Sequence, residues 1–211
     1  MYSVIIPAAG RGSRMGLSYN KLLYSLNDNE TIIQRTVNKF LHFDQFSEII
    51  ITIHPDDLTT FNAMFDHPKI KLVSGGKERW ESVKSGVEAC SNDIIFIHDG
   101  ARCNVSEDLI KNCLEAVTTN HDGGYVCGVK VIDSIREVND GCVTKAVDRS
   151  HLYNMQTPQI FNKEDLLKAY SMGYSDTDEV GLMLQIGKTP KIIEGDYRNL
   201  KVTTKSDLEL L

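Results

Sequence analysis

The sequence lacks the long apolar runs of an integral membrane protein. Its 211 residues contain no uninterrupted apolar stretch that approaches the roughly 18 residues needed to cross a bilayer. Residues 1–10 have no basic stretch ahead of their short apolar run, and Pro7 interrupts that run, so they do not resemble a secretory signal. We therefore expect a cytoplasmic protein with no membrane partner.

Basic residues are scarce as well, since 23 Lys and Arg face 29 Asp and Glu and leave a net charge of −6. Proteins that coat nucleic acids or bind anionic membrane surfaces carry a basic excess. We therefore expect no nucleic-acid partner. A small anionic ligand is still compatible with this charge, because a few local cations are enough to hold it.

Cysteine and histidine occur without the spacing of a disulfide framework or a zinc site. The five cysteines form no CxxC pair, which indicates free thiols in a reducing compartment. The six histidines form no HxH or HExxH pattern, so a structural zinc site is not expected. No low-complexity linker interrupts the chain, and we expect one domain over residues 1–211.

The apolar residues in the first half of the chain predict alternating strands and helices. Continuous apolar runs predict strands at residues 4–7, 48–53, 70–73 and 93–97. Helical spacing predicts helices at residues 31–43, 55–65, 78–90 and 106–118. This alternation is typical of an α/β, Rossmann-like fold with a mainly parallel sheet and helices on both faces. Such folds bind ligands at the carboxyl ends of their strands.

The second half of the chain follows a different pattern. Residues 125–138 and 142–147 are rich in strand-forming residues, and Asn139-Asp140-Gly141 between them predicts a tight hairpin turn. We expect a β-arm at about residues 125–150, inserted in the α/β core. The remaining elements are expected to be helices at residues 163–172 and 177–186, the second capped by Thr177, and strands at residues 191–193 and 200–203.

A glycine-rich loop follows the first predicted strand, in the sequence PAAGRGSRMG at residues 7–16. Gly10 and Gly12 permit turns that present backbone N–H groups to an anion, and Arg14 and Lys21 add two cations. The spacing fits neither a dinucleotide fingerprint, whose third glycine is here Met15, nor a Walker loop. A plain strand-to-helix turn with two surface cations explains the loop about as well.

Two further strand ends carry polar groups. Gly75-Gly76 opens a predicted helix in which the Ser82 hydroxyl could contact a base or sugar, or bond to its own helix backbone. Asp99 follows the fourth predicted strand, where it could hold a metal bound to phosphate or pair with Arg102. We interpret His98 as a structural residue.

Taken together and in order, these segments resemble the 2-C-methyl-D-erythritol 4-phosphate cytidylyltransferase family. The matching segments span residues 7–204 and are PAAGRGSRMG, Lys21, GGKERWESV, HDGAR, VIDSI, AVDRS, QTPQIF, TDE and NLKVTT. Each segment alone is unremarkable, whereas their joint occurrence in this order is specific.

This resemblance implies transfer of CMP from CTP to 2-C-methyl-D-erythritol 4-phosphate, with release of pyrophosphate, in the non-mevalonate pathway to isoprenoids. It also implies Mg²⁺ or another divalent cation as cofactor and a homodimer clasped by the β-arm. The implied catalytic residues are Arg14, Lys21 and Lys201. The residues implied to bind the nucleotide are Ala8, Ala9, Gly10, Gly12, Gly76, Ser82 and Asp99, with Asp99 also at the metal. Those implied to bind the sugar-alcohol phosphate are Arg102, Ser134, Arg149, Thr157 and Thr177.

The sequence departs from the family pattern on the acceptor side. Cys103 stands where the family usually has proline, and Ser134 stands for threonine, although it keeps the hydroxyl. Lys130 replaces a second proline. Two alternatives therefore remain open: a ribitol-5-phosphate cytidylyltransferase, and a nucleotide-binding regulator without catalysis.

Overall fold

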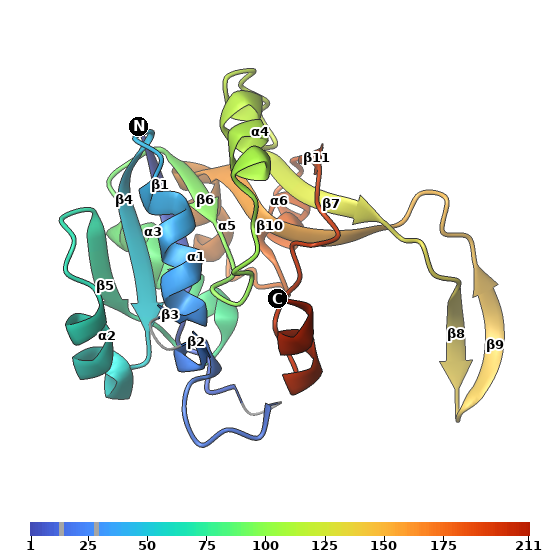
Figure 1. The fold of residues 1–211 in the computed structure, drawn as a ribbon. Coiled ribbons are helices and arrows are strands. Elements are labelled where there is room, and N and C mark those ends of the chain that lie inside the picture. The colour runs from blue at the N-terminus through green and yellow to red at the C-terminus, as the bar shows by residue number, and fades with distance from the viewer. Residues whose placement is uncertain (13–14, 28–29) are drawn as a thin grey trace.

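The computed structural model describes residues 1–12, 15–27 and 30–211, and its main element is a seven-stranded sheet. The strands of this sheet are β1 (Tyr2–Pro7), β4 (Phe46–Ile53), β5 (Ile70–Ser74), β6 (Ile94–Ile97), β7 (Tyr125–Lys130), β10 (Tyr153–Asn162) and β11 (Lys191–Glu194). Their order across the sheet is β11-β7-β10-β6-β1-β4-β5 (Figure 1). β10 runs antiparallel to both of its neighbours, whereas the other pairs are parallel.

Helices cover both faces of the sheet, as the alternation of strands and helices predicts (Figure 1). They are α1 (Ile32–Leu41), α2 (Leu58–Met64), α3 (Arg79–Ala89), α4 (Glu107–Val117), α5 (Lys163–Ser171) and α6 (Glu179–Gln185). One core cluster joins α1, α2 and α4 to the sheet, and a second joins α3, α5 and α6 to it. The expected α/β fold with a mainly parallel sheet is confirmed.

The central strand β1 shows why a continuous apolar run marks a strand covered on both faces. Side chains alternate between the faces of a sheet, so a strand with helices on both sides needs apolar residues at every position. Val4 and Ile6 belong to the core cluster on the α1 face, while Ile5 belongs to the cluster on the α3 face. All three are completely buried.

The boundaries of two predicted helices are confirmed by their caps. The Thr31 hydroxyl accepts a hydrogen bond from Gln34 N at the start of α1, and Ser106 caps α4 in the same way. The predicted helix at 55–65 is divided into a 3₁₀ turn over Pro55–Asp57 and α2. Two short 3₁₀ segments, Lys21–Leu23 and Lys205–Leu210, and the small strand pair β2 (Ser25–Asn27) and β3 (Glu30–Thr31) complete the compact part.

The sequence patterns missed strand β10, because residues 156–161 resemble a polar loop. In the structure β10 lies between β6 and β7, and its pairing with β7 shifts register between Met155 and Gln159. Pro158 falls within that irregular stretch. A proline donates no hydrogen bond to a strand ladder, so an irregularity is where it is tolerated inside a sheet.

A hairpin of β8 (Ile135–Asn139) and β9 (Cys142–Val147) extends away from the rest of the chain (Figure 1). Its turn places Asp140 and Gly141 at positive φ, 47° and 78°, as the predicted tight turn requires. The β-rich residues 125–138, expected in the arm, belong to two different strands, however. Their first part is β7, buried in the main sheet up to Val129, and the arm begins only after it.

Two local expectations near the carboxyl end are also wrong. Residues 200–203 form no strand; Val202 N donates a single hydrogen bond to Ala101 O. The cap of α6 is Asp178, whose carboxylate accepts from Gly181 N, and Thr177 lies one residue before it. A carboxylate and a hydroxyl are both good caps, so the sequence alone could not distinguish these neighbours.

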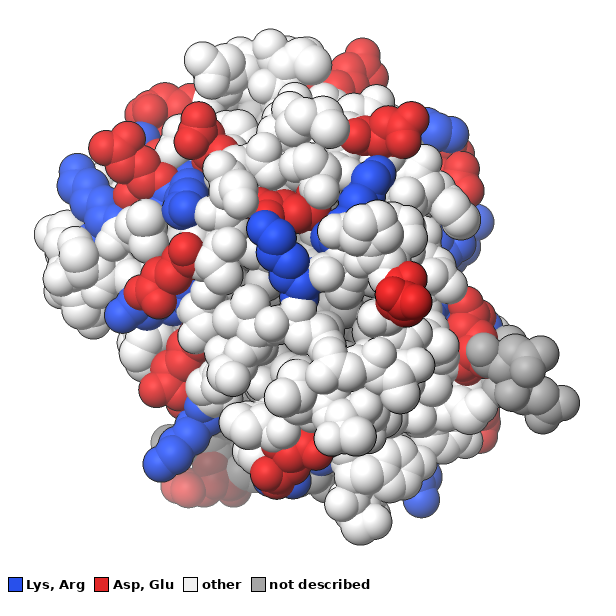
Figure 2. All heavy atoms as spheres, turned by 90° about the vertical axis from the view of Figure 1, so that its left-hand side faces the viewer, with Lys and Arg blue, Asp and Glu red and all other residues white. Residues whose placement is uncertain are grey.

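Charges of both signs are interspersed on the face of the molecule shown in Figure 2. The five cysteines are free thiols, and all but Cys142 are buried. Among the described residues, no helix is both long enough and apolar enough to cross a bilayer.

Candidate active site

A cleft lies at the carboxyl ends of β1 and β6, beside the start of α3. It encloses about 580 Å³ of space open to solvent and is here named the glycine cleft. Its lining residues are Pro7, Ala9, Gly10, Lys21, Leu22, Gly76, Lys77, Glu78, Arg79, Ser82, Asp99, Gly100, Ala101 and Lys201. This is the edge at which α/β sheets bind ligands.

The loop after β1 is held by buried polar contacts. Ala8 N donates to Thr52 O at 2.7 Å, and the Asn20 amide donates to Ala8 O at 2.6 Å. Ala8 is therefore buried beneath the loop, while Ala9 and Gly10 line the cleft. Gly12 has a φ of +68°, and a Cβ there would lie 2.8 Å from Lys21 Cβ, so only glycine fits. Arg14 lies outside the described residues.

The second glycine segment packs directly against the first. A Cβ on Gly75 would lie 2.7 Å from the Ala9 Cβ and 2.8 Å from Ser82 Oγ. Ser82 is buried, and its hydroxyl accepts a hydrogen bond from Gly76 N at 3.1 Å. The serine thus holds the loop that opens α3. Its hydroxyl also donates to Glu78 O, four residues earlier, at 3.3 Å, which is the back-bonded alternative from the sequence, while it still lines the cleft.

Asp99 is the centre of the charged groups in this cleft. Arg79 Nε lies 3.1 Å from Asp99 Oδ1, and Lys201 Nζ lies 2.8 Å from Asp99 Oδ2. Arg102 Nε is 3.6 Å from the same Oδ2. Burial alone would raise the pKa of Asp99, but the charges of Arg79 and Lys201 outweigh it and hold that pKa well below its usual range. Asp99 is therefore an anion that binds cations.

Sequence patterns missed a second ion pair that supports this centre. Arg79 Nη1 and Nη2 donate to the two oxygens of Glu179 at 2.7 and 3.0 Å, a bidentate pair across 100 residues of chain. Glu179 is 1% exposed. Burial lowers the pKa of Arg79, but the attraction of Glu179 and Asp99 raises it further, so Arg79 stays charged. Both residues lie inside segments that carry the family resemblance, the one signal that could have identified them.

A second cleft, here named the Arg102 cleft, adjoins the first. Its lining residues are Arg79, Asp99, Arg102, Met155, Gln156, Thr157, Gln159, Thr177, Asp178 and Lys201. Arg79, Asp99 and Lys201 line both clefts and form their shared wall. Backbone carbonyls hold the Arg102 guanidinium, which donates to Asn199 O at 2.7 Å and to Met155 O at 3.4 Å.

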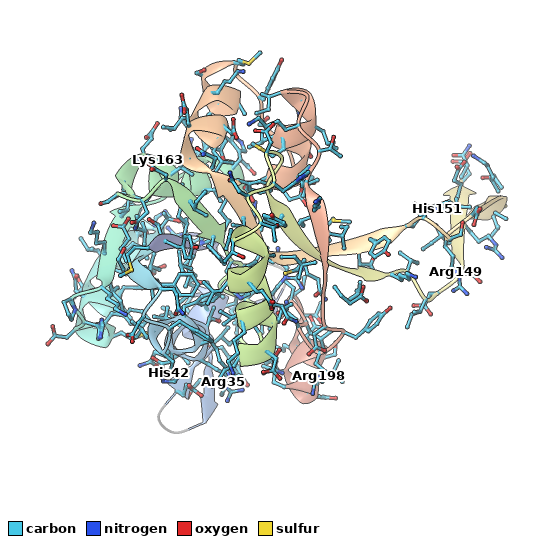
Figure 3. The ribbon with its side chains drawn as sticks, turned by 90° about the horizontal axis from the view of Figure 1, so that it is seen from above. Arg35, His42, Arg149, His151, Lys163 and Arg198 are labelled. Carbon is cyan, nitrogen blue, oxygen red and sulfur yellow. The ribbon has the colours of Figure 1, made fainter. Side chains whose placement is uncertain are left out.

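The structure brings most of the predicted site residues to these two clefts. Lys21 also ties the glycine loop to the opposite wall, because its Nζ donates to Val202 O at 2.6 Å. Ser134 and Arg149 are exposed and lie on the arm, and Figure 3 shows Arg149 far from the body of the chain. Neither residue lines the glycine cleft or the Arg102 cleft of its own chain.

Asp99 is also the residue expected at a metal. Among residues 1–12, 15–27 and 30–211, no group of three or more His, Cys, Asp or Glu side chains is arranged to hold a metal ion. Mg²⁺, however, is usually bound by one or two carboxylates together with substrate phosphates. One buried carboxylate at the edge of an open cleft fits a cation that arrives with a polyphosphate.

Three comparisons with known proteins point to the same family, and each covers nearly the whole chain. The family model described as 2-C-methyl-D-erythritol 4-phosphate cytidylyltransferase matches residues 2–211. Curated proteins of that name from Geobacillus kaustophilus and Bacillus licheniformis are 37% and 36% identical, each covering 98% of this chain and 93% and 92% of its own length. A crystal structure of the Francisella tularensis protein of that name has a TM-score of 0.85 and 32% identity, over 99% of this chain and 96% of that one.

Proposed function

This chain belongs to the 2-C-methyl-D-erythritol 4-phosphate cytidylyltransferase family, and we propose that its two clefts divide the substrates of that reaction between them. The enzyme transfers CMP from CTP to 2-C-methyl-D-erythritol 4-phosphate and releases pyrophosphate. CTP occupies the glycine cleft, with its triphosphate along Ala9, Gly10 and Lys21. The phosphate of the sugar alcohol enters the Arg102 cleft.

The observation that carries this assignment is the shared wall of the two clefts. Arg79, Asp99 and Lys201 line both of them, so two anions bound in the two clefts meet at this wall. Within the described part of the chain, the buried Arg102 Nε has no hydrogen-bond acceptor, which suits a position beside a phosphate oxygen.

The chemistry requires positioning and charge stabilisation rather than a general base. A phosphate monoester has a second pKa of about 6, so the acceptor is largely a dianion near pH 7. One of its oxygens attacks the α-phosphorus of CTP, the new P–O bond forms, and the bond to the β-phosphate oxygen breaks as pyrophosphate leaves. No proton transfer is needed for this balance. Lys21 and Lys201 stabilise the negative charge on the phosphoryl oxygens in the transition state, together with Arg14, which the family resemblance implies for this role.

A divalent cation has one protein ligand in this proposal. Asp99 would hold an Mg²⁺ ion that arrives with the CTP phosphates, and such an ion would supply positive charge beside the leaving pyrophosphate. Lys201 Nζ lies 2.8 Å from Asp99 Oδ2, so this cation stands at the same wall as the carboxylate.

The arm is proposed to complete the acceptor side from a second copy of the chain. Val138 and Val143 on the hairpin are 60% and 67% exposed, which is typical of apolar side chains that a partner covers. Ser134 and Arg149 flank this hairpin and do not line the Arg102 cleft of their own chain. We propose that they contact the acceptor in the partner's site.

Mixed dimers test whether Arg149 acts across the boundary. Arg149→Ala and Lys201→Ala chains are each inactive alone in this proposal. When unfolded together and refolded, half of the dimers pair one chain of each kind, and each such dimer has one site with both residues intact. Activity should return to about a quarter of that of the wild type. No recovery, with mixed dimers demonstrated by differently tagged chains, would show that Arg149 acts within its own chain. An active Arg149→Ala chain would show that Arg149 has no role in the reaction.

Pyrophosphate release tests the activity itself. With CTP and Mg²⁺, we expect release with 2-C-methyl-D-erythritol 4-phosphate and none with ribitol 5-phosphate. Release with ribitol 5-phosphate alone would instead show that the chain is a ribitol-5-phosphate cytidylyltransferase. Calorimetric binding of CTP without release of pyrophosphate from either acceptor would favour the regulator without catalysis.

A further inference from the structure

A buried ring of hydrogen bonds lies directly behind the charged wall of the two clefts. His98, at the end of β6, is completely buried and packs against Phe40, with ring centroids 4.9 Å apart. Its Nδ1 lies 3.1 Å from Thr157 Oγ1 and its Nε2 lies 3.1 Å from Arg102 O. A histidine in this position joins the end of β6, just before Asp99, to strand β10.

The partners of Thr157 determine which way these hydrogen bonds run. Asp99 N donates to Thr157 Oγ1 at 3.0 Å, so the hydroxyl accepts from the backbone and keeps one hydrogen to donate. That hydrogen points to His98 Nδ1, which therefore accepts, and His98 Nε2 carries the proton that is donated to Arg102 O. His98 is thus a neutral imidazole in the Nε2–H tautomer, with both ring nitrogens engaged.

Two further bonds close the ring. Arg102 Nη1 donates to Asn199 O at 2.7 Å, and Asn199 Nδ2 donates to Thr157 O at 2.8 Å. The ring therefore runs through His98, Arg102, Asn199 and Thr157, which are buried or nearly so and come from three separate stretches of the chain. Lys201 lies two residues beyond Asn199, so the ring also fixes the start of the segment that carries it.

We propose that His98 is a positioning residue for the reaction, and that the Thr157 hydroxyl serves this ring rather than the substrate. The ring holds Asp99, Arg102 and Lys201 at the distances needed for two anions to meet. Preorganised charges stabilise a transition state without rearranging during the reaction, and a networked support keeps them so. This inference rests on the proposed division of substrates between the clefts.

Substitutions of His98 and Thr157 separate this role from its alternatives. H98F keeps an aromatic ring against Phe40 but removes both hydrogen bonds, and T157V keeps the shape of Thr157 but removes its hydroxyl. We expect each to lower kcat about 10²-fold, the loss that misplacement of a reacting group by about 1 Å produces. The dissociation constant for CTP should change by less than about threefold, because Ala9, Gly10 and Gly76, which line the rest of the glycine cleft, lie outside the ring. T157S, which retains the hydroxyl, should restore most of kcat.

The double variant gives the decisive comparison. If the two residues act through one ring, H98F/T157V should be no slower than either single variant, because the ring is already open. Multiplied losses, a wild-type kcat in H98F, or a loss confined to the acceptor KM of T157V would each overturn the proposal. The last result would mean that the hydroxyl contacts the acceptor.

Controls keep stability and the proposed function apart from this test. F61L changes a fully buried side chain of α2 outside the ring and should lower the melting temperature without lowering kcat. All assays are run well below the lowest melting temperature in the set. If H98F does not fold, T157V and T157S carry the same comparison. If the wild type itself releases no pyrophosphate, the proposed function fails first and the ring is then judged by the temperature factors and distances of a crystal structure of T157V, in which Asp99 should have moved.

Discussion

Replacing Arg79 by methionine should destabilise the protein strongly. Arg79 is 25% exposed at the cleft, whereas its partner Glu179 is 1% exposed. Methionine retains most of the aliphatic stem, so the change removes the charge and the donors rather than the packing. Glu179 would then be a buried carboxylate without its bidentate partner, while Asp99 would still be paired with Lys201.

The size of the effect follows from this asymmetry. Removing one partner of a buried ion pair costs about 3–5 kcal/mol, because the other charge is left without compensation. In a chain of this length the melting temperature should fall by roughly 6–20 °C. Glu179→Gln should cost only about 1–2 kcal/mol, since the remaining Arg79 is near the cleft water and still has an amide acceptor. The double variant should be more stable than Arg79→Met alone.

Urea denaturation at about pH 7 measures all three variants, with midpoint and slope fitted separately. A coupling of about 1–3 kcal/mol between the two substitutions is expected for residues in direct contact. A loss below about 1 kcal/mol in Arg79→Met would refute this reasoning. So would a double variant as unstable as Arg79→Met, since the instability would then not come from the buried carboxylate.

Three more outcomes are expected elsewhere. Burial raises the pKa of Glu48, but its hydrogen bond from Lys71 and its other donors lower it from 4.5 to about 2. The lowered pKa stabilises the fold by up to about 3 kcal/mol above pH 4.5. This stabilisation is lost as the pH falls through 2. Glu48→Gln should therefore flatten the acid limb of stability against pH, and parallel curves for the two proteins would contradict this. Gly86→Ala would place a Cβ 2.6 Å from Ile5 Cγ2. The overpacking should cost about 1–3 kcal/mol in urea titrations, even though alanine favours the helix by up to about 1 kcal/mol. An unchanged midpoint would mean that β1 shifts to make room for the methyl group. Lys201→Ala should lower kcat/KM about 10²–10³-fold in steady-state assays, as for other lost charge-stabilising groups, while a wild-type value would remove this residue from the reaction.

The sequence predicted those features whose physical cause is local. Continuous apolar runs at β1, β4 and β6 reflect burial on both faces of the sheet, because such burial requires an apolar residue at every position of the strand. The caps at Thr31 and Ser106 were predictable because a cap bonds to a backbone group only three residues away. The glycine segments that line the cleft were predictable for the same reason, since a tight turn needs glycine where it occurs.

Other features depended on partners that the local pattern does not contain. β10 resembles a loop because its polar residues are satisfied by distant groups, as when Gln159 Nε2 donates to Asp178. The arm starts later than predicted because β-rich composition extends through both β7 and β8, and only pairing with β10 and β11 assigns β7 to the main sheet.

The site itself divides along the same line. The residue types at strand ends, Asp99 and the glycine segments, together with the order of segments along the chain, were sufficient to indicate nucleotidyl transfer and the family. The pairing of Arg79 with Glu179 across 100 residues, and the ring through His98, were not visible in any periodic pattern. Burial selects the hydrophobicity of each residue separately, so it is visible in the sequence. An ion pair or a hydrogen bond between distant segments exists only once folding has brought two particular side chains within about 3 Å of each other.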